Sequence, residues 1–358
     1  SRNQRINHST MTPPQLKNFH TANPEFEQAI DRSIPEFAAA QLSDEDKYFK
    51  NHKPPVYLPE IAVEVQDFVK YHLEHSHKRI ALVTSGGTTV PLENNTVRFI
   101  DNFSAGTRGA TSAEYFLENG YAVIFLHREF SLLPYSRHFS HSTNCFLDFM
   151  TEKDNKIQIN DQFADEMLQV WRKYNEAKDT NSLLLIPFTT VNQYLYTLKE
   201  ILENLHIMKS KALFYLAAAV SDFFIPQSRM PQHKIQSSAT QDGELVIRLA
   251  QVPKFLSRLV ENWAQGAMII SFKLETDNNI LIQKAESALE RYHHQLVIGN
   301  LLQTRKKEVV FVTPGHHQEN WIRLTDQEIN DNVEIESKMI PAVIKVHDDW
   351  IAKNDNNN

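Results

Sequence analysis

The sequence is poor in cysteine, with Cys145 the single one among its 358 residues. One thiol cannot form an internal disulfide bond, and it cannot supply a metal site built from several thiolates. An apolar run of the roughly 20 residues that a membrane helix needs is also absent, and the polar residues 1–17 lack the apolar core of a signal peptide. We therefore expect a cytoplasmic protein in a reducing compartment, without a membrane partner.

Positive charge is also scarce, because 37 lysine and arginine residues face 44 aspartate and glutamate residues and leave a net charge of -7. A basic field that would attract nucleic acid is absent, so we expect no nucleic-acid partner. Any phosphate group that this chain binds must be held by local contacts. The hydrophobic share of 41% is enough for a substantial core.

Short apolar runs alternate with helical patterns along most of the chain. The run 80–83 is ended by Ser85-Gly86-Gly87, as in a strand buried on both faces. This alternation predicts an α/β fold, a Rossmann-like and mostly parallel sheet with helices on both faces. Further strands are expected at 121–126, 183–186, 212–219, 267–272, 296–298 and 309–313, and helices at 58–72, 110–119, 194–208, 255–263 and 280–292.

Four segments depart from this alternation. Residues 1–56 are interpreted as an N-terminal extension with short helices at 24–33 and 43–50, ahead of a single α/β domain over 57–353. Within that domain, 140–182 is a long polar insertion. Residues 226–251 are expected to form a flap, an antiparallel β-hairpin in which 233–237 pairs with 244–249 around Asp242-Gly243. The low-complexity tail 354–358 is expected to be disordered.

Two glycine-containing segments can form a phosphate cradle. The first strand ends in Thr84-Ser85-Gly86-Gly87-Thr88, and a helix is expected to begin within Ser104-Ala105-Gly106-Thr107-Arg108-Gly109. Glycines let backbone N–H groups approach an anion, and a helix N-terminus adds partial positive charge. Either segment alone is explained as well by an ordinary turn, whereas the pair favours the cradle.

The spacing of these segments does not match a dinucleotide fingerprint. A GxGxxG turn joins strand to helix directly, whereas about 20 residues intervene here. The next strand ends in His127-Arg128, without the acid that holds the ribose of NAD. An oxidoreductase that uses NADP, with these two residues near the ribose phosphate, is kept as an alternative hypothesis.

Five motifs, in order along the chain, make the sequence similar to a known family. The set resembles phosphopantothenate–cysteine ligase of the eukaryotic, ATP-dependent type, over about residues 79–340. The motifs are Thr84-Ser85-Gly86-Gly87-Thr88, Arg98-Phe99-Ile100-Asp101-Asn102-Phe103-Ser104-Ala105-Gly106, Ala217-Ala218-Ala219-Val220-Ser221-Asp222-Phe223, His233-Lys234-Ile235-Gln236-Ser237 and Ser271-Phe272-Lys273-Leu274-Glu275-Thr276.

The resemblance implies an enzyme of coenzyme A biosynthesis. The family joins the carboxylate of 4'-phosphopantothenate to the amine of L-cysteine through an acyl-adenylate, and it releases AMP and pyrophosphate. This implies ATP as co-substrate, Mg²⁺ and no flavin, and it leaves open a complex with other coenzyme A biosynthetic enzymes. Bacterial members usually use CTP and are fused to a flavin-dependent decarboxylase, which this sequence does not show. It also lacks a clear match to their nucleotide-binding lysine pair around Lys284–Arg291, which favours ATP.

The resemblance also assigns the residues of the site. Asn102 and Lys234 are expected to be catalytic, and Asp222 is a candidate Mg²⁺ ligand. Arg98 is expected to reach the substrate from a second subunit, which implies a homodimer with shared active sites. The nucleotide is expected to contact Gly86, Ser104, Gly106, Gly109, Phe272 and Asn300, and phosphopantothenate to contact Arg98, Asn102, Ala218, Ala219 and Asp222.

Each assignment has an ordinary structural alternative. Asn102 offers neutral amide donors where negative charge builds during capture of the adenylate, or it caps a loop. Lys234 closes over the triphosphate and neutralises pyrophosphate, or it is a surface lysine. Asp222 binds Mg²⁺ directly, acts through water or caps its turn. For Arg98 and Phe272 the alternatives are a surface arginine and a core phenylalanine. A third hypothesis, a non-catalytic scaffold in a biosynthetic complex, is disfavoured by the intact motifs.

Overall fold

The computed structural model describes residues 44–356, except 142, 240, 255–261, 293–294 and 316–318. The helix expected over 24–33 and most of the one expected over 255–263 lie outside the described residues.

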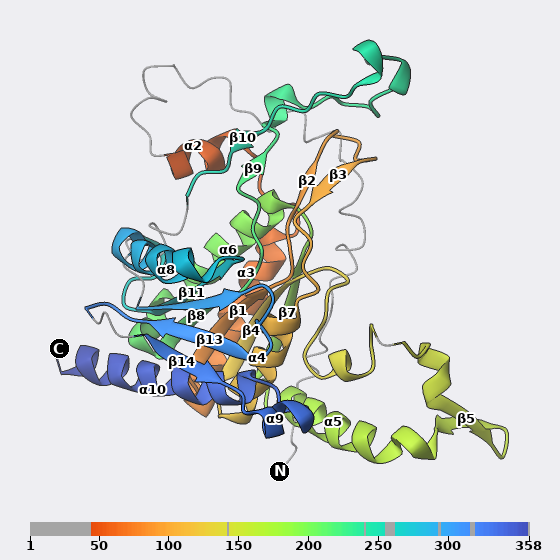
Figure 1. The fold of residues 1–358 in the computed structure, drawn as a ribbon, viewed down its shortest axis with the longest axis vertical. Helices are drawn as coiled ribbons and strands as arrows, with labels where there is room; N and C mark the ends of the chain where they lie inside the picture. The colour runs from red at the N-terminus through yellow and green to blue at the C-terminus, as the bar shows by residue number, and fades with distance from the viewer. Residues whose placement is uncertain are drawn as a thin grey trace.

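At the centre of the fold is an eight-stranded sheet with the order β14-β13-β12-β11-β8-β1-β4-β7 (Figure 1). The strands from β12 to β7 in this order are parallel, β13 is antiparallel to β12, and β14 is antiparallel to β13. The bounds are β1 Ile80–Ser85, β4 Ala122–Arg128, β7 Leu183–Phe188, β8 Ala212–Leu216, β11 Met268–Glu275, β12 Leu296–Leu301, β13 Glu308–Val312 and β14 Asn320–Arg323.

The central strand β1 shows why its sequence is an unbroken apolar run. All six of its residues are buried. Ile80 and Leu82 pack into the core on one face of the sheet, while Ala81 and Val83 pack into the core on the other. A strand covered on both faces needs apolar side chains at every position, because its side chains point alternately to the two faces.

Helices cover both faces of the sheet (Figure 1). Residues of α3 (Leu58–Tyr71) and α6 (Val191–Leu205) form one core with the sheet. Residues of α4 (Thr107–Glu118) and α10 (Glu336–Asp355) form the core on the opposite face. Helix α8 (Asn278–Tyr292) packs on β12 and β13 on the face away from α10, and the short α9 spans Asp326–Asn330. The predicted mostly parallel α/β fold is thereby confirmed.

The described part of the N-terminal extension is attached to the core. Helix α2 (Asp44–Asn51) confirms the helix expected over 43–50. The Tyr48 hydroxyl donates to Asn192 Oδ1 at 2.9 Å, and the Tyr196 hydroxyl donates to the Phe49 carbonyl at 2.7 Å. Asn192 and Tyr196 both belong to α6, so α2 is held against this helix by partly buried polar contacts.

The insertion at 140–182 forms a hairpin and a long helix that project from the sheet (Figure 1). Strands β5 (Met150–Lys153) and β6 (Lys156–Ile159) pair antiparallel, and α5 spans Asp161–Asp179. The Asn160 side chain accepts from the Gln162 N–H at 3.0 Å and so caps α5 at its N-terminus.

The predicted hairpin of the flap is wrong. The described residues of 233–237 and 244–249 form no strand; the antiparallel pair is instead β9 (Phe223–Phe224) with β10 (Ala250–Gln251), at the base of the excursion. The apolar residues of this segment have no core to cover, since Leu245 is 45% and Val246 73% exposed. An isolated two-stranded hairpin is marginal without such a core. We call the excursion over residues 225–249 the arm.

The prediction of a disordered tail over 354–358 is wrong at its first two residues. Helix α10 continues to Asp355, so Asn354 and Asp355 are helical. The Asn354 amide donates to the Trp350 carbonyl at 2.7 Å, and this contact supports the last turn.

Candidate active site at the carboxyl edge of the sheet

Residues expected to bind nucleotide and substrate lie at one edge of the sheet. Gly86 follows β1, Ala218 follows β8, and Phe272 and Asn300 lie within the second halves of β11 and β12. These strands are parallel neighbours, so their carboxyl ends meet at the same edge. Open α/β sheets bind ligands at this edge. The topology therefore brings together residues that are far apart in the sequence.

Gly86 is needed for both its backbone conformation and its lack of a side chain. Its φ is +84°, in the left-handed region that favours glycine, and a Cβ built there would lie 2.5 Å from the Cβ of Arg128. Its carbonyl accepts from the Ala219 N–H at 2.7 Å, which joins the end of β1 to the segment after β8.

The N-terminus of α4 faces this loop. Gly106, at the N-cap with a φ of +81°, provides no side-chain cap, and the first turn of the helix contains no acidic residue. The Gly106 carbonyl accepts from the Ser85 hydroxyl at 3.1 Å, and the Gly106 N–H donates to the Ser104 hydroxyl at 3.3 Å. A Cβ at Gly109 would lie 2.3 Å from Ser85 Oγ, so glycine lets α4 lie close against β1. The result is an uncapped helix N-terminus, suited to an anion.

Asn102 lies beside the same loop. Two short strands, β2 (Thr89–Pro91) and β3 (Phe99–Asp101), pair antiparallel ahead of it. The Asn102 N–H donates to the Thr88 carbonyl at 3.1 Å, and a Cβ at Gly87 would lie 1.7 Å from the Asn102 carbonyl oxygen. The side chain of Asn102 is exposed. Its backbone is thus fixed while its amide is available to a ligand.

Arg128 holds this arrangement together. Its guanidinium donates to both carboxylate oxygens of Asp101, each at 3.1 Å, and to the Gly87 carbonyl at 2.8 Å. Such bidentate pairs fix geometry as well as adding energy. Arg128 therefore ties the residue before Asn102 to the glycine loop. The commitment of Arg128 to Asp101 counts against its proposed contact with the ribose phosphate of NADP.

His127 is not a free cation at this edge. It is buried, 8% exposed, and its Nδ1 lies 3.0 Å from the carbonyl of Arg128. Burial lowers the pKa of His127 to about 4, although the backbone hydrogen bond opposes this shift. The imidazole is neutral at pH 7 and cannot attract a phosphate by charge.

The segment after β8 is held to the glycine loop by several hydrogen bonds. The Ala218 N–H donates to Thr84 Oγ1 at 3.2 Å, and the Ser221 N–H donates to Thr88 Oγ1 at 2.9 Å. The Asp222 carbonyl accepts from the Val252 N–H at 2.8 Å, while the side chain of Asp222 is exposed. Ala218, Ala219 and Asp222 are thus placed beside the loop of Gly86.

Asp222 is the candidate magnesium ligand, and it does not belong to a preformed cluster. Within the ranges that the structure describes, no group of three or more His, Cys, Asp or Glu residues could hold a metal ion. Mg²⁺ is commonly held by one or two carboxylates together with substrate phosphates and water. An exposed carboxylate at the end of a strand fits that mode, in which the ion binds together with the nucleotide.

The two residues expected nearest the nucleoside have different environments. Phe272 is partly buried and meets the Tyr215 ring edge-on, with the centroids 4.9 Å apart. Asn300 is buried, 7% exposed, and pairs in register with Leu274 of β11. Phe272 is therefore both part of the core and partly accessible at the edge.

Arg98 and Lys234 lie on the two excursions from the carboxyl edge. Arg98 precedes β3, and its Nη1 donates to Glu93 Oε1 at 3.1 Å. Lys234 lies in the arm with an exposed side chain, and in the part of the chain described its ammonium makes no ion pair. The Asn94 N–H donates to the Pro231 carbonyl at 2.8 Å, so the arm and the β2–β3 connection are in contact.

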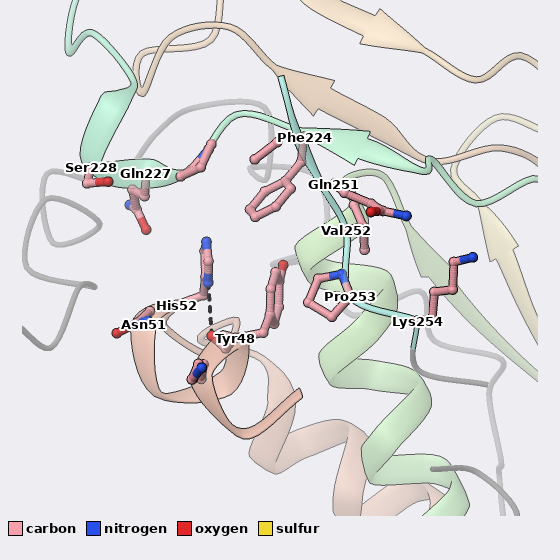
Figure 2. Close-up of a pocket in the computed structure, with 13 residues that line it drawn as sticks. Tyr48, Asn51, His52, Phe224, Gln227, Ser228, Gln251, Val252, Pro253 and Lys254 are labelled. Atoms are coloured by element: carbon pink, nitrogen blue, oxygen red, sulfur yellow. Dashed lines mark hydrogen bonds between the residues drawn. The ribbon is translucent and has the colours of Figure 1, made fainter. Parts of the chain in front are cut away.

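A pocket of about 730 Å³ lies apart from these residues, between α2 and the β9–β10 pair (Figure 2). Tyr48 and His52 contribute from α2 and the residue after it, and Phe224 and Val252 from the base of the arm. The rings of Tyr48 and His52 are stacked, with centroids 4.2 Å apart. None of the predicted site residues lines this pocket.

The sequence does not predict the structural roles of three residues at this site. Asp101 and Arg128 form a pair that joins segments 27 positions apart, whereas Arg128 was expected only near a ribose phosphate in the NADP alternative. Glu93 is a buried carboxylate for which the sequence predicts no role. A charged residue in an otherwise apolar stretch, Val90-Pro91-Leu92-Glu93, was the available signal.

Comparison with known proteins matches residues 187–340 to a family described as the DNA/pantothenate metabolism flavoprotein C-terminal domain. The phosphopantothenate–cysteine ligase CAB2 of Saccharomyces cerevisiae is 52% identical over 355 residues, which cover 93% of this chain and 94% of that protein. The phosphopantothenate–cysteine ligase of Homo sapiens is 44% identical over 281 residues, covering 77% of this chain and 88% of that protein.

The chain is also similar to solved structures. A mutant of Cab2 in complex with phosphopantothenate-cysteine has a TM-score of 0.81 at 54% identity, covering 87% of this chain and 99% of that one. A DNA/pantothenate metabolism flavoprotein from Streptococcus pneumoniae has a TM-score of 0.50 at 19% identity, covering 75% of this chain and 97% of that one, and is similar in fold. In the described ranges, no helix has the length and apolarity that a membrane span requires.

Proposed function

The chain belongs to the phosphopantothenate–cysteine ligase family, and on that premise we propose that it joins 4'-phosphopantothenate to L-cysteine in coenzyme A biosynthesis. The bond formed is an amide between the carboxylate of phosphopantothenate and the cysteine amine. The observation that carries the proposal is the convergence of the Gly86 loop, the uncapped N-terminus of α4 and the exposed Asn102 at one edge of the sheet.

A carboxylate must be activated before an amine can displace its oxygen. In the proposed first step, the carboxylate oxygen attacks the α-phosphorus of ATP, and pyrophosphate leaves. In the second step, the cysteine nitrogen attacks the acyl carbon, loses a proton and expels AMP. Neither step changes the oxidation state of any atom, so no flavin is required. What the protein supplies is positioning and charge stabilisation.

The phosphates of ATP are proposed to lie at the N-terminus of α4 and along the Gly86 loop. Ser104 provides a hydroxyl, Gly106 leaves the N-terminus of α4 without a side-chain cap, and Gly109 allows close packing on β1. Phe272 and Asn300 lie on the strands beyond β8 and are proposed to contact the nucleoside, where the choice of ATP over CTP is made. Asp222 is proposed to hold Mg²⁺, which neutralises phosphate charge when it is bound.

Phosphopantothenate is proposed to lie against Ala218, Ala219, Asp222 and Asn102. The exposed amide of Asn102 donates to the acyl oxygen as negative charge builds on it, because a neutral donor does not form a fixed ion pair with the ground-state carboxylate. Lys234, on the arm, neutralises the departing pyrophosphate. Arg98 is proposed to bind phosphopantothenate in the site of a second subunit, so the active unit is a homodimer. A cytoplasmic location and an association with other enzymes of the pathway stay predictions.

An isotope experiment tests the acyl-adenylate. We expect 4'-phosphopantothenate labelled with ¹⁸O in its carboxylate to transfer one ¹⁸O atom to AMP during ligation, because the attacking oxygen stays on the α-phosphorus. Mass spectrometry of AMP and pyrophosphate measures the transfer. Label in neither AMP nor its cleavage products, or label in inorganic phosphate with ADP formed, would exclude the adenylate route.

A further inference from the structure

The side chain of Glu93 is completely buried in the connection between β2 and β3, with an exposed fraction of 0%. A buried carboxylate is costly unless it is paired and hydrogen-bonded, because it loses its hydration. Glu93 lies outside every group of residues that the proposed function uses. Its burial therefore needs an explanation of its own.

Glu93 is surrounded by donors from two separate segments. From its own connection, the N–H groups of Val97 and Arg98 donate to Oε2 at 3.3 and 3.0 Å. From the arm, the Ile235 N–H donates to Oε1 at 3.2 Å. Burial alone would raise the pKa of Glu93, but the hydrogen bonds from Arg98, Ile235 and Val97 outweigh it and hold that pKa below its usual value.

The side chain of Arg98 is oriented by the same carboxylate. Its Nη1 donates to Glu93 Oε1 at 3.1 Å and to the Ile235 carbonyl at 3.0 Å, which uses both hydrogens of that nitrogen. The Nε and Nη2 groups of Arg98 make no hydrogen bond to any residue within the described ranges. They form one edge of the guanidinium, the fork that binds two oxygens of a phosphate or carboxylate.

The arm is fixed at the residue next to Lys234. Both backbone groups of Ile235 are engaged, the N–H by Glu93 and the carbonyl by Arg98. The Asn95 N–H also donates to the Gln232 carbonyl at 2.9 Å, on the other side of Lys234. The backbone around Lys234 is therefore attached to the β2–β3 connection, while its side chain stays exposed.

We propose that Glu93 is a positioning residue that joins Arg98 and the Lys234 segment into one unit, so that both cations are presented to bound substrates with fixed geometry. This inference rests on the proposed function for the roles of the two cations. Without the Glu93 carboxylate, Arg98 loses the contact that directs its free edge outward, and Ile235 loses an acceptor that holds the arm.

The variant Glu93→Gln keeps the size of the side chain and removes its charge and one acceptor oxygen. We expect kcat/KM for 4'-phosphopantothenate to fall at least tenfold, mainly through KM, with KM for cysteine changed less than threefold. Glu93→Asp, which keeps the charge, should recover part of the loss. Glu114→Gln is the matched control, because Glu114 is another buried carboxylate paired with an arginine, Arg137, away from the site; it should retain wild-type KM values.

A double-mutant cycle and hydrogen exchange separate positioning from general stability. If Glu93 acts through Arg98, then Glu93→Gln combined with Arg98→Lys should be no worse than the more severe single variant. Additive losses of kcat/KM would overturn the proposal. So would losses of kcat/KM that only follow the melting temperature across the variants, Glu114→Gln included. Exchange at the amides of Arg98 and Ile235 should accelerate in Glu93→Gln, and unchanged exchange there would also overturn it. If the wild type makes no ligation product, the proposed function fails, and the exchange data then decide the structural part separately.

Discussion

At the residue scale, Asn102 and Lys234 are assigned to different steps of the reaction. We expect Asn102→Ala to keep exchange of pyrophosphate into ATP within about twofold of wild type, and to slow capture by cysteine by about 10²-fold, the effect of losing one oxyanion donor. Lys234→Ala should instead slow the exchange, because pyrophosphate charge builds in that step. The two partial reactions measured in each variant decide this assignment. Asn175→Ala and Lys153→Ala, on the projecting insertion, serve as controls. An Asn102→Ala enzyme with unimpaired ligation would contradict the role assigned to Asn102.

His347 makes stability depend on pH. It is completely buried, its Nε2 donates to the Ser210 carbonyl at 2.8 Å, and its Nδ1 accepts from the Tyr121 hydroxyl at 2.6 Å. The proton lies on Nε2 because a carbonyl can only accept. Burial lowers the pKa of His347 to about 4, although the hydrogen bond to Ser210 opposes this shift. The unfolded chain then binds a proton near pH 6.5 that the folded chain does not bind.

We therefore expect the free energy of unfolding to fall as the pH falls from about 6.5 to about 4, by up to about 3 kcal/mol from this one residue. His347→Phe should be less stable at pH 7 and lose less on acidification than the wild type. Urea unfolding at a series of pH values measures both effects. His75→Phe, at an exposed position, should leave the profile unchanged, and an equal acid loss in His347→Phe and wild type would refute the assignment.

At this scale, residues with a local signal were predictable from the sequence, and residues whose role depends on distant partners were not. Gly86 and Gly106 each indicate a turn without reference to a distant partner, and both have a positive φ. Glu93 accepts from the Ile235 N–H, 142 positions away, and no local pattern shows which donors will surround a carboxylate. The roles of Asn102 and Lys234 came from family resemblance and stay predictions.

At the element scale, the close contact between α4 and β1 depends on Gly109. A Cβ there would lie 2.3 Å from Ser85 Oγ and 2.5 Å from its Cβ, and neither position can relax by rotation of a long side chain. We expect Gly109→Ala to lower the free energy of unfolding by about 1–3 kcal/mol, the usual cost of overpacking, and to raise KM for ATP. Denaturant unfolding measures the first effect and steady-state kinetics the second.

A second substitution shows whether the clash is the cause. Ser85→Gly removes both atoms that the new methyl group would meet. In the Gly109→Ala background it should therefore lower the KM for ATP part of the way back to the wild-type value. Thr107→Ala, at the exposed first residue of α4, is the control for a helix substitution without a clash. A Gly109→Ala protein with wild-type stability would show that α4 can move away from β1 at little cost.

Elements were predictable where burial sets their period and not where nothing covers them. The apolar run at 80–83 and the helical pattern at 194–208 correspond to β1 and α6, because both lie in the core. The arm contains the apolar run Leu245-Val246-Ile247, yet Val246 is 73% exposed and the described residues of the arm form no ladder. An apolar run predicts a strand only if one face has a core to pack against.

At the scale of the whole molecule, the proposal that Arg98 completes the site of a second subunit predicts a homodimer with shared sites. We expect neither Arg98→Ala nor Asn102→Ala homodimers to ligate at a substantial rate. Purified mixed dimers should recover up to about half of wild-type activity per active site, because each has one intact site out of two. Differently tagged subunits, co-expressed and purified through both tags, provide the test. Confirmed mixed dimers without recovered activity would mean that each site is built from one chain.

The central claim is that this chain is an ATP-using ligase of phosphopantothenate and cysteine. The most direct test incubates the purified protein with 4'-phosphopantothenate and Mg²⁺, with ATP or CTP, in the presence or absence of cysteine, and follows pyrophosphate release and products by mass spectrometry. The account predicts phosphopantothenoylcysteine, AMP and pyrophosphate that depend on cysteine, with ATP preferred. A folded protein that forms no such product with either nucleotide would contradict the account, and product with CTP alone would contradict the choice of nucleotide.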